Sequence, residues 1–243
     1  MKIKIEPSKL KDMLTTGLIA GQLSNVTAII TPNGLSFQDI SLGTLGVYAI
    51  YAKDYFPQGV FENQNESVTV TKFLLDVLNK GFKNDEQIEL YTDNNRLYVN
   101  GARDKYEDII PEITAAEFPV KMKSEQYGII PAKTDLTQAL IAKFAVDELN
   151  FMDAESYQFI SNGKKLDVRI EQTDTSSYTK TLKPLMVANM PAMTAVFSGE
   201  LFNAILKPLT GEVWLVMTPD AMTISKKEKT FSITMLVTTR DVA

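Results

Sequence analysis

The chain has 243 residues, a formal net charge of −5, and neither cysteine nor histidine. This composition excludes a disulfide framework, a thiolate nucleophile and a thiolate metal site, and it removes the commonest general base. A hydrophobic content of 44% is typical of a globular protein with a substantial core, in one large domain or two small ones. No apolar run approaches the length of a membrane span and the first residues do not form a signal peptide, so we expect a cytoplasmic protein.

The first half of the chain predicts short strands and two amphipathic helices. Lys and Ile alternate at the start, as in a half-buried strand, and Asn33-Gly34 suits a type I′ hairpin turn. The expected elements are, in order, a strand at 1–5, a helix at 8–20, a hairpin at 26–37, strands at 45–51 and 67–70, a helix at 71–83, a hairpin at 88–99 and a strand at 105–110.

One stretch of this half recurs later in the chain. Residues 71–99 and 198–224 share the order helix, breaker, strand, turn, strand, and Lys80 of the first copy matches Lys207 of the second. A repeat with a period of about half the chain indicates two similar domains rather than a solenoid.

The second half predicts the same plan. Its expected elements are a strand at 127–130, a helix at 133–144 striped by Leu136, Leu140 and Phe144, a second Asn-Gly hairpin at 157–170, a strand at 178–185, a helix at 198–208 and a last strand at 231–237. The fold class is therefore α+β, with two similar β-α-β-β-β-β-α-β-β-β domains. We predict domains at 1–113 and 127–243, joined by a connector at 114–126.

The order and spacing of these elements resemble a DNA sliding clamp of the proliferating cell nuclear antigen (PCNA) type, either archaeal or a viral or phage-like processivity factor. Three stretches of the first half carry the resemblance: IEPSKLKDML, ITPNGLSFQDI and VTVTKFLLDVLNKGFKNDEQIELYTDNNRLYVNG. T4-type phage clamps share the same fold. The resemblance implies a homotrimeric ring that encircles duplex DNA without reading its sequence and tethers a polymerase, with no enzymatic activity and no cofactor or metal. Such a protein would act on the nucleoid, or in the host cytoplasm if viral.

Lysines on the four predicted helices are the candidate DNA contacts. Eight lysines lie there against four carboxylates, Asp12, Asp76, Asp135 and Glu200, although the whole chain is acidic. A positive helical surface suits sequence-independent contact with phosphates, although lysines also complement helix dipoles and pair with acids along one helix face. The predicted set is Lys9, Lys11, Lys72, Lys80, Lys83, Lys133, Lys143 and Lys207.

The resemblance also implies a partner-binding site under the connector, which takes a short peptide motif of the polymerase or the clamp loader. The implied residues are Ile40, Thr44, Leu45, Val47, Phe118, Val120, Met122, Tyr127, Met222, Leu236 and Val237. Thr44 stands where the family has a characteristic histidine. Each apolar member also fits ordinary core packing, an alternative that the sequence leaves open.

Two alternative functions stay open at the level of sequence. One is a carboxylate-based hydrolase of two-domain α+β architecture, because two carboxylates on different strands leave no sequence signature. The other is a two-domain viral processivity or scaffold protein that closes no ring. Against an enzyme, no Gly-rich phosphate loop, nucleophile elbow or Ca²⁺-loop pattern is present. For a ring, the strands expected at 105–110 and 178–185 are candidate sheet edges that neighbouring chains would pair.

Overall fold

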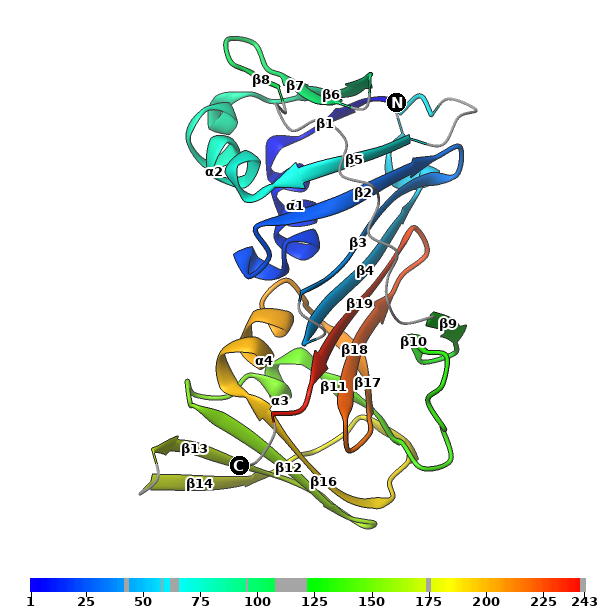
Figure 1. The fold of residues 1–243 in the computed structure, drawn as a ribbon, viewed down its shortest axis with the longest axis vertical. Coiled ribbons are helices and arrows are strands. Elements are labelled where there is room, and N and C mark those ends of the chain that lie inside the picture. Colours follow the sequence, from blue (N-terminus) through cyan, green and yellow to red (C-terminus); the bar gives the residue numbers. More distant parts are fainter. Residues whose placement is uncertain are drawn as a thin grey trace. The chain divides into compact units, whose positions relative to one another are not determined.

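Strands dominate the architecture, and a few short helices cover them (Figure 1). The structure is a computed structural model that describes residues 1–41, 44–57, 59–61, 66–94, 96–107, 122–173 and 176–240. It divides into two units. Unit 1 comprises Met1–Asp39, Val47–Pro119 and Glu228–Ser232, and unit 2 comprises Ile40–Gly46, Val120–Lys227 and Ile233–Ala243. The domain boundaries expected at residues 113 and 126 stay predictions.

Unit 1 has two antiparallel sheets, ordered β1-β6-β7-β8 and β4-β3-β2-β5. In its described residues, single-turn 3₁₀ helices follow α1, β4 and α2, namely η1 (Ile19–Gly21), η2 (Lys53–Tyr55) and η3 (Phe82–Asn84). The longer elements are β1 (Lys2–Ile5), α1 (Pro7–Gly17), β2 (Asn25–Thr31), β3 (Gly34–Ser41), β4 (Leu45–Ala52), β5 (Glu66–Thr71), α2 (Lys72–Lys80), β6 (Ile88–Asp93), β7 (Arg96–Asn100) and β8 (Lys105–Glu107).

The core of unit 1 lies between its sheets and the paired helices α1 and α2, which pack side by side (Figure 1). Leu10 and Leu14 of α1 are buried at helical spacing, and so are Leu74 and Leu78 of α2. Both amphipathic helices expected from the sequence are thus confirmed. Helices this short are stabilised mainly by the burial of such apolar stripes.

Unit 2 also has two large sheets, ordered β15-β11-β17-β18-β19 and β14-β13-β12-β16, and a separate hairpin of β9 and β10. Its elements are β9 (Met122–Glu125), β10 (Gly128–Pro131), β11 (Leu140–Ala145), α3 (Val146–Leu149), β12 (Ser156–Asn162), β13 (Leu166–Thr173), β14 (Ser176–Thr181), β15 (Met186–Asn189), β16 (Ala192–Ser198), α4 (Gly199–Leu206), β17 (Glu212–Met217), β18 (Ala221–Lys227) and β19 (Phe231–Thr238). An aromatic cluster fills its core, where the ring of Phe202 on α4 stacks on Phe151 at 5.7 Å between centroids.

The repeated order of elements is confirmed. In the described residues, unit 1 runs β-α-β-β-β-β-α-β-β-β, and the part of unit 2 that begins at β11 follows the same plan with one additional strand, β15. The expected α+β class with two similar halves therefore holds for the structure.

The helix predicted at 133–144 is wrong. The segment turns around Asp135, whose carboxylate accepts hydrogen bonds from the backbone N and Oγ1 of Thr137 at 2.9 and 2.7 Å, and then continues as strand β11. The spacing of Leu136, Leu140 and Phe144 fits a helix, but a short apolar run after a turn equally fits a buried strand. Pairing of β11 with β17 on one side and β15 on the other decides between them.

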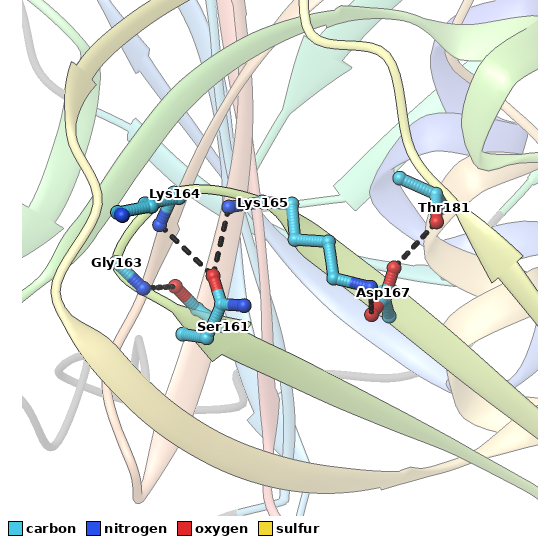
Figure 2. Close-up of polar contacts among 7 residues, drawn as sticks. Ser161, Gly163, Lys164, Lys165, Asp167 and Thr181 are labelled. Carbon is cyan, nitrogen blue, oxygen red and sulfur yellow. Dashed lines mark hydrogen bonds and ion pairs between the residues drawn. The ribbon is translucent and has the colours of Figure 1, made fainter.

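The type I′ turn predicted at Asn33-Gly34 is also wrong, although the hairpin itself is correct. Thr31 pairs with Gly34, so the two-residue loop is Pro32-Asn33, and the φ of proline cannot be positive as a type I′ turn requires. In the second hairpin the side chain of Asn162 shapes the turn instead. Its Oδ1 accepts hydrogen bonds from the backbone N of Lys164 and of Lys165, both at 3.0 Å (Figure 2).

Candidate functional site

Three of the predicted lysines of unit 1 are exposed on its helical elements. Lys11 lies on α1, Lys80 ends α2 and Lys83 lies on η3. All three side chains are exposed, and within the part of the chain that the structure describes no hydrogen bond or ion pair holds them. Their ammonium groups are therefore available to an external anion such as a phosphate.

The two other predicted lysines of unit 1, Lys9 and Lys72, form hydrogen bonds within the unit. Lys9 donates from Nζ to the carbonyl oxygen of Tyr55 at 3.1 Å, and its Nζ lies 4.1 Å from the centroid of that ring. Lys72 donates from Nζ to the carbonyl oxygen of Gly21 at 3.1 Å. These contacts fix both ammonium groups on the surface of unit 1, so they add positive charge there but are less free to reach a ligand.

Unit 2 arranges its predicted lysines differently. Lys133 lies in the turn after β10 and Lys143 lies on strand β11, so neither is on a helix as the sequence predicted. The Nζ of Lys143 forms an ion pair with Glu212 on the neighbouring strand β17. Lys207, at the C-terminal end of α4, is exposed as expected for a residue that matches Lys80.

A cavity of about 400 Å³ lies between α3 and the end of α4, within unit 2. Apolar side chains line it together with two amides and three charged groups, in full Val146, Asp147, Asn150, Phe151, Asp153, Asn203, Leu206, Lys207 and Leu209. Asn203 is held in place, because its Nδ2 donates to Asp153 Oδ1 and its Oδ1 accepts from the Tyr157 hydroxyl, both at 3.1 Å. Lys207 therefore shares this cavity with two carboxylates.

The predicted partner-binding residues separate by burial. Five are core residues with almost no exposed surface, namely Leu45, Val47, Met222, Leu236 and Val237. Four others retain exposed surface, namely Ile40, Thr44, Met122 and Tyr127. Phe118 and Val120 lie outside the described residues. Core packing thus accounts for the first five, and only the second set offers side chains to a partner.

The β9–β10 hairpin is anchored to the larger sheet of unit 2 at Gly128 and Ile129. Gly128 has φ +108°, and a Cβ at this position would lie 2.2 Å from the Cβ of Ser225. Next to it, the backbone N of Ile129 donates to Thr234 Oγ1 at 3.2 Å, and the hydroxyls of Thr234 and Ser225 are 2.9 Å apart. Glycine lets the hairpin approach β18 closely enough for this buried polar contact to form.

Tyr127, at the turn of that hairpin, packs against Trp214 of β17. Their ring centroids are 4.9 Å apart with an interplanar angle of 61°. Both rings are half-buried, and together with Leu136 they cover a small apolar cluster made of Ile130, Ala139, Ile141 and Val216. Sequence reasoning missed Trp214. The available signal was that it is the only tryptophan of the chain.

Within the described residues, each unit has a sheet whose last strand has a neighbouring strand on one side. Strand β8 is last in the β1-β6-β7-β8 sheet, and β14 is last in the β14-β13-β12-β16 sheet. Exposed aromatic rings accompany both edges. Tyr178 on β14 is 54% exposed, and Phe73 of α2, which is 65% exposed, lies 6.2 Å from the ring of Tyr106 on β8. The two sheet edges expected from the sequence are therefore edges in the described structure.

The residues that the structure describes, 1–240 with the gaps given above, offer neither a metal-binding cluster nor a membrane-spanning helix. No group of three or more carboxylates is arranged to hold a metal ion there. No helix there is both long and apolar enough to cross a membrane.

Several solved PCNA structures have the same fold as this chain. The chain superposes on PCNA from the PCNA2–PCNA3 complex of Sulfolobus tokodaii with a TM-score of 0.72 and 17% identity, over 99% of both chains. It matches A. fulgidus PCNA bound to the C-terminal region of FEN-1 with a TM-score of 0.73 and 13% identity, over 100% of this chain and 99% of that one. Entamoeba histolytica PCNA matches with a TM-score of 0.73 and 12% identity, over 98% of both chains.

No protein-family profile and no curated protein matches the sequence. At these identities the structural likeness establishes the fold. The chain therefore has the fold of PCNA-type sliding clamps from end to end, as the resemblance in its sequence implied.

Proposed function

We propose that this chain is a subunit of a ring-shaped sliding clamp that encircles duplex DNA and tethers a DNA polymerase to it. The observation that carries the proposal is the clamp fold over 98–100% of the chain. The proposed role is mechanical rather than enzymatic, and it would be performed on the nucleoid, or in the host cytoplasm if the protein is viral.

The two edge strands support assembly into a closed ring. An open edge exposes unpaired N–H and C=O groups, and pairing it with another chain removes that liability. In the proposed homotrimer, β8 of each protomer pairs with β14 of the next, and the contact is head to tail, so three copies close the ring. Exposed Phe73 and Tyr178 would become buried at this interface, where aromatic side chains are enriched.

The exposed lysines support sequence-independent contact with the duplex. Phosphate contacts position a protein on DNA but carry no sequence information. A ring needs only weak contacts of this kind, because it leaves the duplex by opening or by reaching an end rather than by breaking every contact. Lys11, Lys80 and Lys83 are the side chains that we expect to contribute first, because they are free of other contacts in the described structure.

The surface around Tyr127 supports a site for a short peptide motif of the polymerase or the clamp loader. Half-buried Tyr127 and Trp214 present apolar rings beside the β9–β10 hairpin, and Ile40, Thr44 and Met122 also keep exposed surface. A few anchor side chains in such shallow sites carry most of the binding free energy. The likeness to a PCNA structure with the C-terminal region of FEN-1 bound is consistent with a partner of this kind.

The chain's lack of cysteine allows a direct test of the ring. Lys105→Cys on β8 combined with Ser177→Cys or Thr179→Cys on β14 introduces one thiol at each proposed edge. If β8 pairs with β14 of the next chain, mild oxidation of one of these double variants yields a covalent three-chain species on a denaturing gel. Each single-cysteine variant provides the control, since it can form at most a two-chain species.

Light scattering of the unmodified protein at several concentrations completes the test. The proposal expects a mass about three times the chain mass of 27.1 kDa. A monomer at every concentration, together with no covalent product from either double variant, would instead favour the two-domain processivity or scaffold protein that closes no ring.

A further inference from the structure

We infer that the phosphate contacts of the proposed clamp are made by unit 1, and that the helical surface of unit 2 contributes little to DNA binding. The inference rests on the proposed function and deepens it, because it states which of the two repeated halves holds the duplex. It arises from a difference in charge between two surfaces that the repeat alone would make equivalent.

The helical surface of unit 1 is strongly positive. Helices α1 and α2 pack side by side, and η3 follows α2 and contacts both (Figure 1). These elements carry two carboxylates, Asp12 and Asp76, against five lysines, Lys9, Lys11, Lys72, Lys80 and Lys83. Lys11, Lys80 and Lys83 form no hydrogen bond or ion pair within the described residues, so their positive charge is available to phosphates.

The helical surface of unit 2 is acidic. Helix α3 is a single turn that carries Asp147 and Glu148, and α4 carries Glu200 in its first turn. Lysines next to these helices include Lys207 at the C-terminal end of α4 and Lys180 beside α3. Lys180 compensates part of this charge, because its Nζ lies 3.3 Å from the carboxylate of Glu148.

Lys207 itself lies in an acidic environment. It lines the same cavity as Asp147 and Asp153, and both carboxylates are exposed to solvent. At physiological ionic strength, charges interact over a Debye length of about 8 Å. A phosphate close enough to meet Lys207 is therefore also repelled by the neighbouring carboxylates, which lowers the net attraction.

The other candidate lysines of unit 2 do not restore the balance. Lys143 is on a strand, and its charge is paired with Glu212. Lys133 is exposed, but it lies in the turn after β10 rather than on the helical surface. The matching positions Lys80 and Lys207 therefore occupy opposite electrostatic settings, and the repeat does not imply equal roles.

The test compares two double variants with the same loss of charge. Lys11→Gln with Lys80→Gln removes two positive charges from unit 1. Lys133→Gln with Lys207→Gln removes two positive charges from unit 2. Affinity for a fluorescent DNA duplex is measured by anisotropy over a range of salt concentrations. Each lost phosphate contact lowers the magnitude of the slope of log K against log salt by about 0.9. We therefore expect this magnitude to fall by about 2 for each protomer that contacts the duplex in the unit 1 variant, and by less than half of that in the unit 2 variant.

A third double variant provides the control. Lys164→Gln with Lys227→Gln removes the same charge from the β12–β13 hairpin (Figure 2) and from the end of β18, and should leave the slope unchanged. In a further arm, Asp147→Asn should strengthen DNA binding, whereas Asp220→Asn, in the turn between β17 and β18, should not.

The outcomes separate this inference from the proposed function. Equal decreases for the unit 1 and unit 2 variants would overturn the inference and leave DNA encirclement intact. A slope that none of the lysine variants changes would contradict the DNA contact itself.

Discussion

At the scale of single residues, Gly128 shows how a close approach between backbones depends on the absence of a side chain. Its φ of +108° disfavours every other residue, and Ser225 occupies the space a Cβ would need. Gly163 has a similar φ of +84°, but the nearest atom to a Cβ there is the carbonyl oxygen of Met190, at 3.7 Å. Substitution of Gly128 therefore causes both backbone strain and crowding, whereas substitution of Gly163 causes backbone strain alone.

We predict that Gly128→Ala destabilises the fold by about 2–4 kcal/mol, because left-handed backbone and overpacking both contribute. Gly163→Ala should cost only about 1–2 kcal/mol, from the backbone alone. Urea unfolding of both variants measures the difference. Equal losses would mean that the hairpin is not pressed against β18 as described.

Trp214 gives the proposed partner site a built-in reporter. It is the only tryptophan of the chain and contacts Tyr127 directly. We predict that titration with the C-terminal peptide of the cognate polymerase changes its fluorescence, and that Tyr127→Ala weakens peptide binding by at least tenfold, about 1.4 kcal/mol or more. The unfolding midpoint should fall little in Tyr127→Ala, because the ring is only half-buried.

Leu45→Ala is the matched comparison for that prediction. Leu45 is 2% exposed, so its truncation should lower stability by about 2–5 kcal/mol before it affects a surface. Calorimetry that detects peptide binding with no fluorescence change, and with the same affinity in Tyr127→Ala, would place the partner site elsewhere.

Sequence reasoning identified accessible lysines better than it distinguished their roles. Lys11 and Lys80 are exposed as their helical positions predicted. Lys9 and Lys72 occupy similar positions but bond to carbonyl oxygens 46 and 51 residues away in sequence. Such contacts depend on the tertiary fold and leave no local pattern, so they could not be predicted from the sequence.

At the scale of elements, long amphipathic patterns were predictable and a short apolar run was not. Helices α1, α2 and α4 have about two to three turns each, and their buried residues recur at helical spacing. Strand β11 has six residues that are mostly buried, and its period fits either structure. Its pairing partners β15 and β17 lie far along the chain, and they decide the outcome.

A charge swap across two strands tests this assignment. Lys143 and Glu212 lie diagonally on β11 and β17, because Lys143 pairs with Trp214 and Ala145 with Glu212. We predict that Lys143→Glu lowers stability by about 0.2–1 kcal/mol, since it brings two carboxylates together on a partly exposed surface. Adding Glu212→Lys should restore the loss.

The size of the coupling in this double-mutant cycle is the readout. Strictly additive effects of the two substitutions would mean that the side chains are not neighbours, and β11 would not pair with β17 in the described register. Glu89→Lys, on β6 of unit 1, is a suitable unrelated charge reversal, and it should not rescue Lys143→Glu.

At the scale of the whole molecule, the internal repeat made the fold predictable and the assembly only partly so. The order of elements, the two halves and both edge strands followed from patterns within one chain. The number of subunits depends on the angle at which two edges meet, which no sequence pattern encodes. The partner site was harder still, because core and surface apolar residues look alike in sequence, as Leu45 and Ile40 illustrate.

The net charge of −5 also has meaning only at this scale. An acidic chain is compatible with DNA binding when its positive charges are gathered on one surface and its negative charges lie elsewhere. A ring of such chains would hold DNA by enclosing it. Because its contacts with the phosphates would be weak, it could slide along the duplex. This topological link is the central claim of the proposed function.

Retention on circular DNA tests that claim most directly. The double-cysteine protein is incubated with a circular plasmid under reducing conditions, oxidised to close the ring, and passed through a sizing column at high salt. We predict that the oxidised ring elutes with the circular plasmid although high salt has removed its contacts with the phosphates. We also predict that cutting the plasmid once releases the ring. Loss from the circle at high salt despite complete cross-linking, or retention after the plasmid is cut, would contradict encirclement.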